Sequence, residues 1–324
     1  MELVNLLLRS FFLAILLSNV TAHLSRQRRE ITHSEDCPTP MTKGTTPNLE
    51  HIFVGRCLEF QQIHSSRYNC PGARVNCSDA WLKFKEAVVG QDPCNINDNA
   101  YDELLDLIPI EFADDMTLFW SGTNKLAHGY AAASPTTSTL EDSMLGYMVN
   151  GLNWCSSEGS DEYSSDPCPD QEPDSCTHTS TGVFWASVST MLAKQASGIA
   201  IVMVNGSSPW PAFYNGSFFA KYELPNLDPD KVTNVRIIVA HNIGGPINEQ
   251  CGRGSVKTMQ ELTAARGLAY TCEGTPRDVQ SFQCVENAGH AECQPRTDAT
   301  GGIVREGKMR KRIRTQTEPA SSIS

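Results

Sequence analysis

The pattern of apolar and polar positions predicts helices in the first half of the chain. The segment SDAWLKFKEAVVG places three apolar side chains on one helical face, namely Trp81, Phe84 and Val88. We expect Ser78 to cap this helix and Gly90 to end it. The segment YDELLDLIP repeats the helical spacing and stops at Pro109, because proline cannot continue a helix. These patterns predict a mainly helical subdomain over residues 51–180.

The pattern changes in the second half, where a helical segment precedes two continuous apolar runs. VFWASVSTMLAKQ has helical spacing, and the runs IAIVMVNG and VRIIVAHN, the latter near residues 235–242, are short and β-branched. Such runs are typical of strands buried on both faces of a parallel sheet. We therefore expect an α/β subdomain over 181–295, with a small parallel sheet flanked by helices. Its segment 251–293 carries four cysteines and one or two helical turns, and is expected to form a disulfide-stapled C-terminal cap.

Both ends of the chain are predicted to lie outside the folded region. Residues 1–22 have the short apolar run and small-residue end of a signal peptide rather than a membrane span. Residues 23–50 are expected to be a polar leader, with the basic stretch at 26–29 either a processing site or a solvated start. Residues 296–324 are expected to be a basic, disordered tail.

Charge and cysteine content narrow the class of protein. The 324-residue chain has a formal net charge of −11, which argues against a nucleic-acid partner. Twelve cysteines behind a signal peptide predict six disulfides in an oxidising compartment, and no CxxC pairing suggests a metal site. Glycosylation sequons occur at Asn76, Asn205 and Asn215. We expect a protein that is secreted or lies in the lumen of the secretory pathway, with no membrane span.

Four places along the chain carry candidate chemistry: Trp120–Ser121, Glu141–Asp142, Trp185 with Ser189, and Glu223. Each also has a purely structural interpretation. Tryptophans more often pack in cores, adjacent acids often begin helices, and a glutamate on an edge strand is usually solvated. Apolar and polar residues alternate in the segment NGSFFAKYELPNL around Glu223, as they do in a short strand. Composition alone therefore does not identify an active site.

Taken together, these segments resemble the ADP-ribosyl cyclase family, NAD glycohydrolases that also make cyclic ADP-ribose. The resemblance extends from about Cys57 to Cys293 and rests on LFWS, TLEDSMLGYMVNGLNWC, GVFWASVS, IVMVNGS and YELPNL in the family's order. It implies a secreted enzyme that cleaves the nicotinamide–ribose bond of NAD and forms cyclic ADP-ribose, ADP-ribose or both. NAD is then the substrate and no cofactor is expected. A homodimer, a plain NAD glycohydrolase with little cyclisation, and a catalytically silent binding protein on the same scaffold stay open.

The resemblance also implies roles for single residues. Glu223 matches the catalytic glutamate, whose carboxylate would stabilise or bond to the oxocarbenium-like carbon. Glu141 would face the nicotinamide, with Asp142 as the capping member of the pair. The other implied substrate-binding positions are Trp120, Ser121, Asn150, Trp185, Ser189 and Phe218. Phe219 is a further substrate-binding candidate, with packing in the core beside the strand as the open alternative. An aromatic side chain at Phe218 is shared with the soluble cyclases and is expected to favour cyclisation by stacking on the adenine.

The cysteines support the resemblance. Carrying over the family's bridges gives Cys57–Cys77, Cys94–Cys176, Cys155–Cys168, Cys251–Cys272 and Cys284–Cys293. This leaves Cys37 and Cys70 to pair with each other. A vertebrate bridge has no counterpart, since Phe112 and Ser197 stand near its positions. In this the chain resembles the soluble invertebrate cyclases.

One departure concerns phosphate binding. Gly122 stands where vertebrate members carry an arginine after the Trp-Ser pair. Binding of the diphosphate is then expected to rely on Ser121, on backbone amides and on Lys125.

Overall fold

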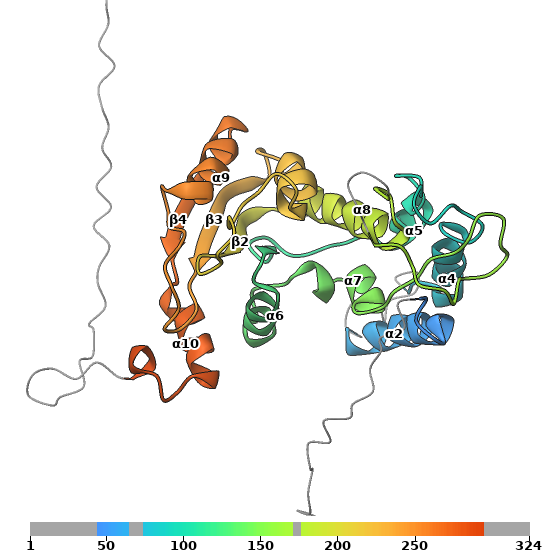
Figure 1. Cartoon of the computed structure of the whole chain (residues 1–324), viewed down its shortest axis with the longest axis horizontal. Coiled ribbons are helices and arrows are strands. Elements are labelled where there is room, and N and C mark those ends of the chain that lie inside the picture. The colour runs from blue at the N-terminus through green and yellow to red at the C-terminus, as the bar shows by residue number, and fades with distance from the viewer. Residues whose placement is uncertain (1–43, 65–73, 171–175, 295–324) are drawn as a thin grey trace, which may run out of the picture. The chain divides into compact units, whose positions relative to one another are not determined.

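The computed structural model describes residues 44–64, 74–170 and 176–294, all within one compact unit. The first part of this unit is mainly helical. Its α-helices are α2 (Leu49–Ile63), α4 (Cys77–Glu86), α5 (Asp102–Leu107), α6 (Asn124–Ala133) and α7 (Met144–Val149). The long helix α8 (Ser180–Gln195) runs from this region to the sheet (Figure 1).

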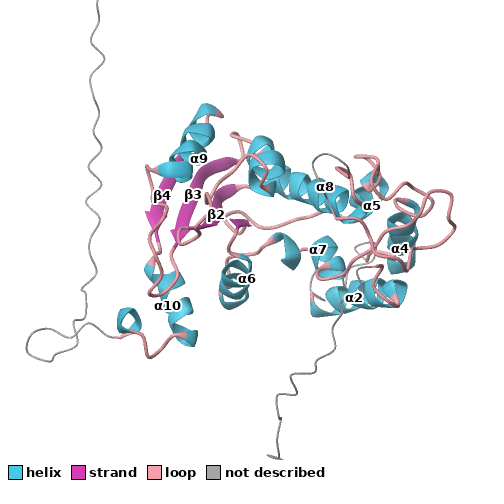
Figure 2. Cartoon of the chain, in the orientation of Figure 1, coloured by secondary structure: helices cyan, strands magenta, loops and turns pink. Residues whose placement is uncertain are grey.

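A four-stranded parallel sheet forms the second part (Figure 2). Its strands lie in the order β1 (Leu118–Ser121), β2 (Gly198–Asn205), β3 (Val232–Ala240) and β4 (Tyr270–Gly274). The two central strands are the apolar runs expected from the sequence, which confirms the α/β class. Because all four strands are parallel, their carboxyl ends share one edge of the sheet.

Two strands and two helices were not expected. Strand β1 comes from the segment 51–180, so the sheet takes its first strand from the region predicted to be mainly helical. The segment 251–293 contains α9 (Gly254–Ala265), β4 and α10 (Arg277–Glu286), which is more than the expected one or two helical turns. Strand β1 is only four residues long and β4 is largely exposed. Neither therefore has the long apolar run by which a buried strand is recognised.

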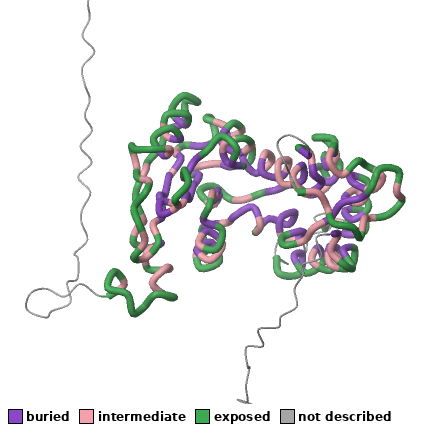
Figure 3. The backbone as a smooth tube through the Cα atoms, in the orientation of Figure 1, coloured by how far each residue is buried: buried purple, intermediate pink, exposed green. Residues whose placement is uncertain are grey.

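The core of the helical part is aromatic. Phe84 is fully buried and lies 5.0 Å from Trp154 and 4.8 Å from Phe53, measured between ring centroids. The indole of Trp154 donates a 2.9 Å hydrogen bond to the hydroxyl of Tyr101, which donates in turn to a backbone carbonyl of α8. Such satisfied polar tips allow large rings to be buried. Buried positions follow the inner faces of the helices and the central strands (Figure 3).

Helix α4 begins one residue earlier than its predicted cap. The side-chain oxygen of Asn76 accepts hydrogen bonds from the backbone amides of Ser78 and Asp79, at 3.1 and 3.4 Å. The prediction of Ser78 as the cap is therefore wrong. Both residue types favour the N-cap position, so the sequence pattern could not separate them. Helix α4 forms as predicted but ends at Glu86 and not at Gly90, whereas the termination of α5 before Pro109 is as predicted.

Five disulfides form in the pairing that the resemblance implied: Cys57–Cys77, Cys94–Cys176, Cys155–Cys168, Cys251–Cys272 and Cys284–Cys293. The bridge expected between Cys37 and Cys70 involves residues outside the described ranges. So do the signal peptide, most of the polar leader and the basic tail. In the described part of the chain no helix is both long and apolar enough to cross a bilayer.

The segment around Glu223 is helical rather than extended. Residues Phe219–Glu223 form a π-helical turn, η2, which continues into the 3₁₀ turn η3 (Leu224–Asn226). The strand-like alternation in the sequence is therefore misleading here. Phe219, Glu223 and Leu224 are the buried members of the two turns. π-Helical turns are rare and occur often at functional sites.

Candidate active site

A cavity of about 410 Å³ opens beside the carboxyl end of β1, between α8, η2 and the 3₁₀ turn η1 (Leu140–Asp142). It has the size of a small-molecule site. Eight residues that the sequence singled out line it together: Trp120, Ser121, Glu141, Asn150, Trp185, Ser189, Phe218 and Glu223. They come from segments about a hundred positions apart in the chain. The position next to a parallel sheet's carboxyl edge is where the fold class predicts a ligand.

Glu223 is the buried carboxyl group of this cavity, with a side chain only 7% exposed. The hydroxyl of Ser189, one turn along α8 from Trp185, donates a 3.1 Å hydrogen bond to its Oε1 atom. Among the described residues nothing hydrogen bonds to Oε2. Burial raises the pKa of Glu223 to about 8; the Ser189 hydrogen bond opposes this rise and the charge of Glu141 adds to it. A buried carboxyl group with one free oxygen suits contact with a cation.

Glu141 supplies the second carboxyl group. Its Oε1 atom lies 3.5 Å from Nε2 of His128 on α6, and Oε2 has no hydrogen-bond partner among the described residues. Burial favours the neutral form, but the hydrogen bond and positive charge of His128, together with smaller contributions from a backbone amide and the side chain of Thr139, outweigh it and lower the pKa of Glu141. Glu141 is therefore held as a carboxylate, whereas burial favours the protonated form of Glu223.

The two neighbouring acids have separate tasks, as expected. The Oδ2 atom of Asp142 accepts hydrogen bonds from the backbone amide and the hydroxyl of Thr139, at 2.7 and 3.0 Å, which closes a capping box on η1. Helix α7 then begins with its own cap, since the hydroxyl of Ser143 accepts from the amide of Gly146 at 3.1 Å. Capping by Asp142 leaves the side chain of Glu141 free to line the cavity.

The two indoles come from different walls of the cavity. Trp120 lies on β1 and meets the ring of His128 edge-on, with the centroids 5.6 Å apart. Trp185 lies on α8 against the buried ring of Phe184, at 5.3 Å. Both indoles are half-buried. They give the cavity flat apolar surfaces on which an aromatic ring can rest.

The two neighbouring phenylalanines lie in different surroundings. Phe218 is 37% exposed and lines the cavity, whereas Phe219 is 1% exposed and packs against Phe119 and Phe213, with ring centroids 5.9 and 6.3 Å away. The prediction that Phe219 contacts the substrate is therefore wrong, since it belongs to the core. Successive side chains on a helical turn point in different directions, so only one of the pair can face the cavity.

The expected phosphate contacts are only partly in place. Ser121 and Gly122 line the cavity together with Asn124, but Lys125 is exposed and does not line it. Gly122 adopts φ 68°, and its carbonyl accepts a 3.1 Å hydrogen bond from the side-chain amide of Asn205. A glycan on Asn205 would replace one of the two N–H hydrogens of that amide and leave a single one for this bond. Of the other two sequons, Asn76 and Asn215 are exposed, although Asn76 also caps α4.

Sequence reasoning missed several residues of this region. Tyr214 and Ser217 line the cavity from the loop before η2, and nothing in their spacing marks them. His128 supports Glu141 from outside the cavity lining. Thr139 was overlooked as well, although the sequence Thr-x-x-Asp before an apolar run is a capping signal that could have identified it.

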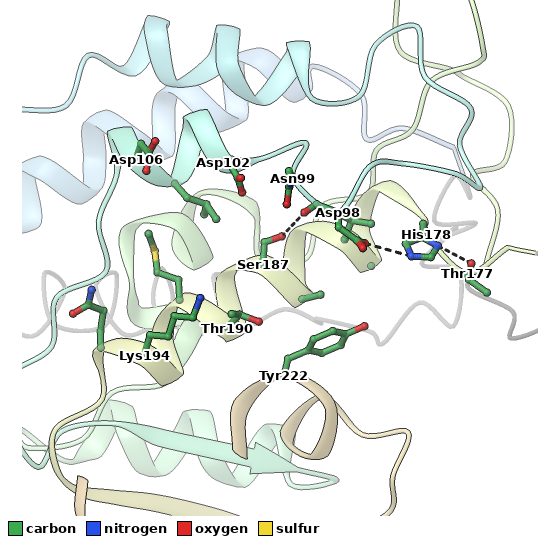
Figure 4. Close-up of a pocket in the computed structure, with 16 residues that line it drawn as sticks. Asp98, Asn99, Asp102, Asp106, Thr177, His178, Ser187, Thr190, Lys194 and Tyr222 are labelled. Atoms are coloured by element: carbon green, nitrogen blue, oxygen red, sulfur yellow. Dashed lines mark hydrogen bonds and ion pairs between the residues drawn. The ribbon is translucent and has the colours of Figure 1, made fainter. Parts of the chain in front are cut away.

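A second cavity, of about 670 Å³, is lined by α8 residues other than those of the first cavity (Figure 4). Asp102 and Asp106 of α5 lie on one side of it, and Thr190 and Lys194 of α8 on another, with Tyr222 close by. Although it is larger, its lining contains neither a buried carboxyl group nor an indole. The candidate chemistry is therefore in the smaller cavity.

Comparison with known proteins agrees with this geometry. The ADP-ribosyl cyclase family matches residues 46–293. The chain is 36% identical over 252 residues to an ADP-ribosyl cyclase/cyclic ADP-ribose hydrolase of Aplysia californica, covering 77% of this chain and 87% of that protein. It is 34% identical over 251 residues to ADP-ribosyl cyclase/cyclic ADP-ribose hydrolase 2 of Rattus norvegicus, covering 78% and 76%.

Solved structures show the same likeness in three dimensions. The crystal structure of Aplysia cyclase complexed with substrate NGD and product cGDPR superimposes with a TM-score of 0.70 at 36% identity, covering 78% of this chain and 98% of that one. Porcine CD38 complexed with a covalent intermediate, ribo-F-ribose-5′-phosphate, gives 0.66 at 30% identity, with 71% and 97% covered.

Proposed function

The chain belongs to the ADP-ribosyl cyclase family of enzymes, and on this premise we propose that it cleaves the nicotinamide–ribose bond of NAD in the cavity lined by Glu223. The single observation that carries the proposal is the state of that carboxyl group. It is buried and is oriented by Ser189 through one oxygen, and its other oxygen has no hydrogen-bond partner within residues 44–64, 74–170 and 176–294. The related porcine protein has been captured with a covalent intermediate, which fits a nucleophilic or ion-pairing group at this place.

The chemistry needs little beyond that carboxylate. When the bond breaks, nicotinamide leaves as a neutral molecule, so no general acid is required. The positive charge moves to the ribose carbon, where the free oxygen of Glu223 can stabilise it or bond to it. The positively charged nicotinamide ring of bound NAD also favours the ionised form of Glu223, which offsets the effect of burial on its pKa.

The other lining residues have roles that follow from their chemistry. The carboxylate of Glu141 can accept hydrogen bonds from the carboxamide of nicotinamide. Trp120 and Trp185 can hold flat rings, and Asn150 offers an amide at the cavity wall. Ser121 and Gly122 lie where the diphosphate would be bound. No resident cofactor is part of the proposal, since NAD itself is consumed.

We also propose that cyclic ADP-ribose is a substantial product. Phe218 is exposed to the cavity and can stack on the adenine, which brings its N1 atom toward the ribose. The Aplysia relative is complexed with a cyclic product, cGDPR. Plain hydrolysis to ADP-ribose is the alternative, because water competes for the same intermediate. A catalytically silent binding protein is disfavoured, since Glu223 and both indoles are present in the cavity.

The five disulfides favour an oxidising compartment, so we propose that the protein acts outside the cell or in the secretory lumen. Glycosylation at Asn215, and a homodimer, are part of the same proposal.

The experiment is to incubate the purified protein with NAD and to resolve nicotinamide, ADP-ribose and cyclic ADP-ribose by chromatography. We expect release of nicotinamide together with both ribose products. A folded protein that binds NAD without releasing nicotinamide would favour the silent alternative. Release of nicotinamide with ADP-ribose alone would retain the cleavage step but reject cyclisation.

A further inference from the structure

His128 lies behind the cavity and contacts two of its lining residues. It stands on α6, with its side chain 27% exposed, and does not itself line the cavity. Its Nε2 atom is 3.5 Å from Oε1 of Glu141, and its ring meets Trp120 edge-on. On the other side, its Nδ1 atom is 3.3 Å from the hydroxyl of Thr139. Both ring nitrogens are thus engaged at once.

The hydrogen bonds around Thr139 determine which nitrogen carries a proton. The Oδ2 atom of Asp142 accepts from both the amide and the hydroxyl of Thr139, and a carboxylate cannot donate. A hydroxyl has one proton, so the Thr139 oxygen has none left for His128 and can only accept from it. The Nδ1 atom of His128 must therefore be the donor in this contact.

The contact of Nε2 with Glu141 requires a proton on that nitrogen as well, so the ring is positively charged. A neutral imidazole has a single N–H, and with that proton on Nδ1 the lone pair of Nε2 would face the Glu141 carboxylate. Two acceptors facing each other repel. Only the imidazolium donates to both Thr139 and Glu141. The hydrogen bond to Glu141 raises the pKa of His128, and although burial opposes this, the charges of Glu141 and Asp142 add to it.

We propose that His128 is a positioning residue, which as an imidazolium holds the Glu141 carboxylate ionised and aimed into the cavity for the nicotinamide end of NAD. This inference rests on the proposed function, because it takes Glu141 as a contact of NAD. Its consequence is that NAD binds more weakly once His128 has lost its proton. The deprotonated Nε2 atom of His128 then faces Glu141 as an acceptor. Glu141 thereby loses the hydrogen bond that it received from α6.

The other charged groups near His128 do not take over its interaction with Glu141. From η1 it faces Glu141 and Asp142, whose charges raise its pKa. Glu223 of η2 is further on and is itself affected by the charge of Glu141. Helix α10 packs against α6 through Phe282, and its Asp278 is engaged by the hydroxyl of Tyr130 at 2.5 Å. Strand β1 contributes only the indole of Trp120. The titration that affects Glu141 is therefore that of His128.

The test measures NAD binding by calorimetry between about pH 6 and pH 9 in a Glu223→Gln background. This background removes turnover and the titration of Glu223 itself. In it we expect the dissociation constant for NAD to rise with pH. Adding His128→Gln, whose amide donates without titrating, is expected to abolish this rise. Adding His128→Leu is expected to weaken binding about tenfold at low pH and to leave it independent of pH. The matched control is His51→Gln, an exposed histidine on α2, which should behave as the background does.

An unchanged pH dependence in the His128→Gln protein would overturn the inference. A second readout does not depend on NAD at all. The His128 ring is titrated by NMR, with its signal identified by its loss in His128→Gln. Glu141→Gln should lower the pKa of His128, and an unchanged value would contradict the pairing. If the background protein binds no NAD while this coupling is observed, the proposed function fails and the His128–Glu141 pair stands.

Discussion

Among single residues, Glu223 combines deep burial with the charge that the proposed reaction requires. In the part of the chain that the structure describes, only one side-chain hydrogen bond, from Ser189, helps to stabilise its ionised form. A buried charge with so little compensation is costly to the folded state. Activity and stability should therefore place opposite demands on this position, as they often do in active sites.

Glu223→Gln is expected to stabilise the protein at high pH. A glutamate in the unfolded chain has a pKa of about 4.3, whereas burial raises that of folded Glu223 to about 8. Between these values the folded state binds more protons, so the free energy of unfolding falls as pH rises. Glutamine cannot ionise and avoids this loss, which is on the order of a few kcal/mol above about pH 8. The melting temperatures of variant and wild type should nearly agree at about pH 4 and separate toward pH 9. A constant separation would contradict a buried, titrating carboxyl group.

Phe218 allows a second test at the same scale. If its ring stacks on the adenine, Phe218→Thr should lower the ratio of cyclic ADP-ribose to ADP-ribose, by about two- to tenfold for a stacking contribution of about 0.5–1.5 kcal/mol. The neighbouring substitution Phe219→Leu is the matched control, because Phe219 packs in the core and does not line the cavity. It should leave the product ratio unchanged. An unchanged ratio in an active Phe218→Thr enzyme would show that Phe218 does not direct the adenine.

At the scale of elements, the placement of Glu141 depends on how closely η1 approaches α7. A Cβ atom on Gly146 would clash with the carbonyl of Leu140 and lie 2.7 Å from the Cα atom of Glu141. Glycine is therefore required in α7 so that the turn carrying Glu141 can fold back over it. The capping box of Thr139 and Asp142 fixes the turn from the other side.

Gly146→Ala is expected to push η1 away and to misplace Glu141. Displacements of about 1 Å cost up to about a hundredfold in activity, so kcat/KM for NAD should fall strongly. Gly55→Ala on α2 is the matched control, since nothing lies within 4 Å of a Cβ atom there. That change should leave activity intact and stabilise the helix by about 0.5–1 kcal/mol. Normal activity in the Gly146→Ala protein would mean that the position of η1 does not matter.

Elements also show what the sequence could and could not predict. The central strands and α8 were predictable because long apolar runs and a helical period leave few alternatives. The turn η2 was not predictable, because the alternation of apolar and polar residues around Glu223 by itself favours a strand. Packing of Phe219 beneath it, against Phe119 and Phe213, comes from distant parts of the chain. Local pattern cannot report such contacts.

At the scale of the whole molecule, the site exists only because remote segments meet. Trp120 lies on β1, whose partner strand β2 is about eighty residues further along the chain. The Cys94–Cys176 disulfide links the first half of the helical part to the segment just before α8. The resemblance to a family supplied the list of site residues, and the structure separates those that line the cavity from Phe219. Neither the resemblance nor the sequence pattern could identify His128, because its role appears only once the contacts around Glu141 are known.

We propose above that cleavage of NAD depends on the carboxylate of Glu223. The most direct measurement compares the rate of nicotinamide release by wild type, by Glu223→Gln and by Glu261→Gln, an exposed glutamate of α9 that serves as the control. We expect Glu223→Gln to lose about a thousandfold or more in kcat, at roughly 1.4 kcal/mol per tenfold, while NAD binding is retained and Glu261→Gln matches wild type. A folded Glu223→Gln protein that releases nicotinamide at the wild-type rate would contradict the account.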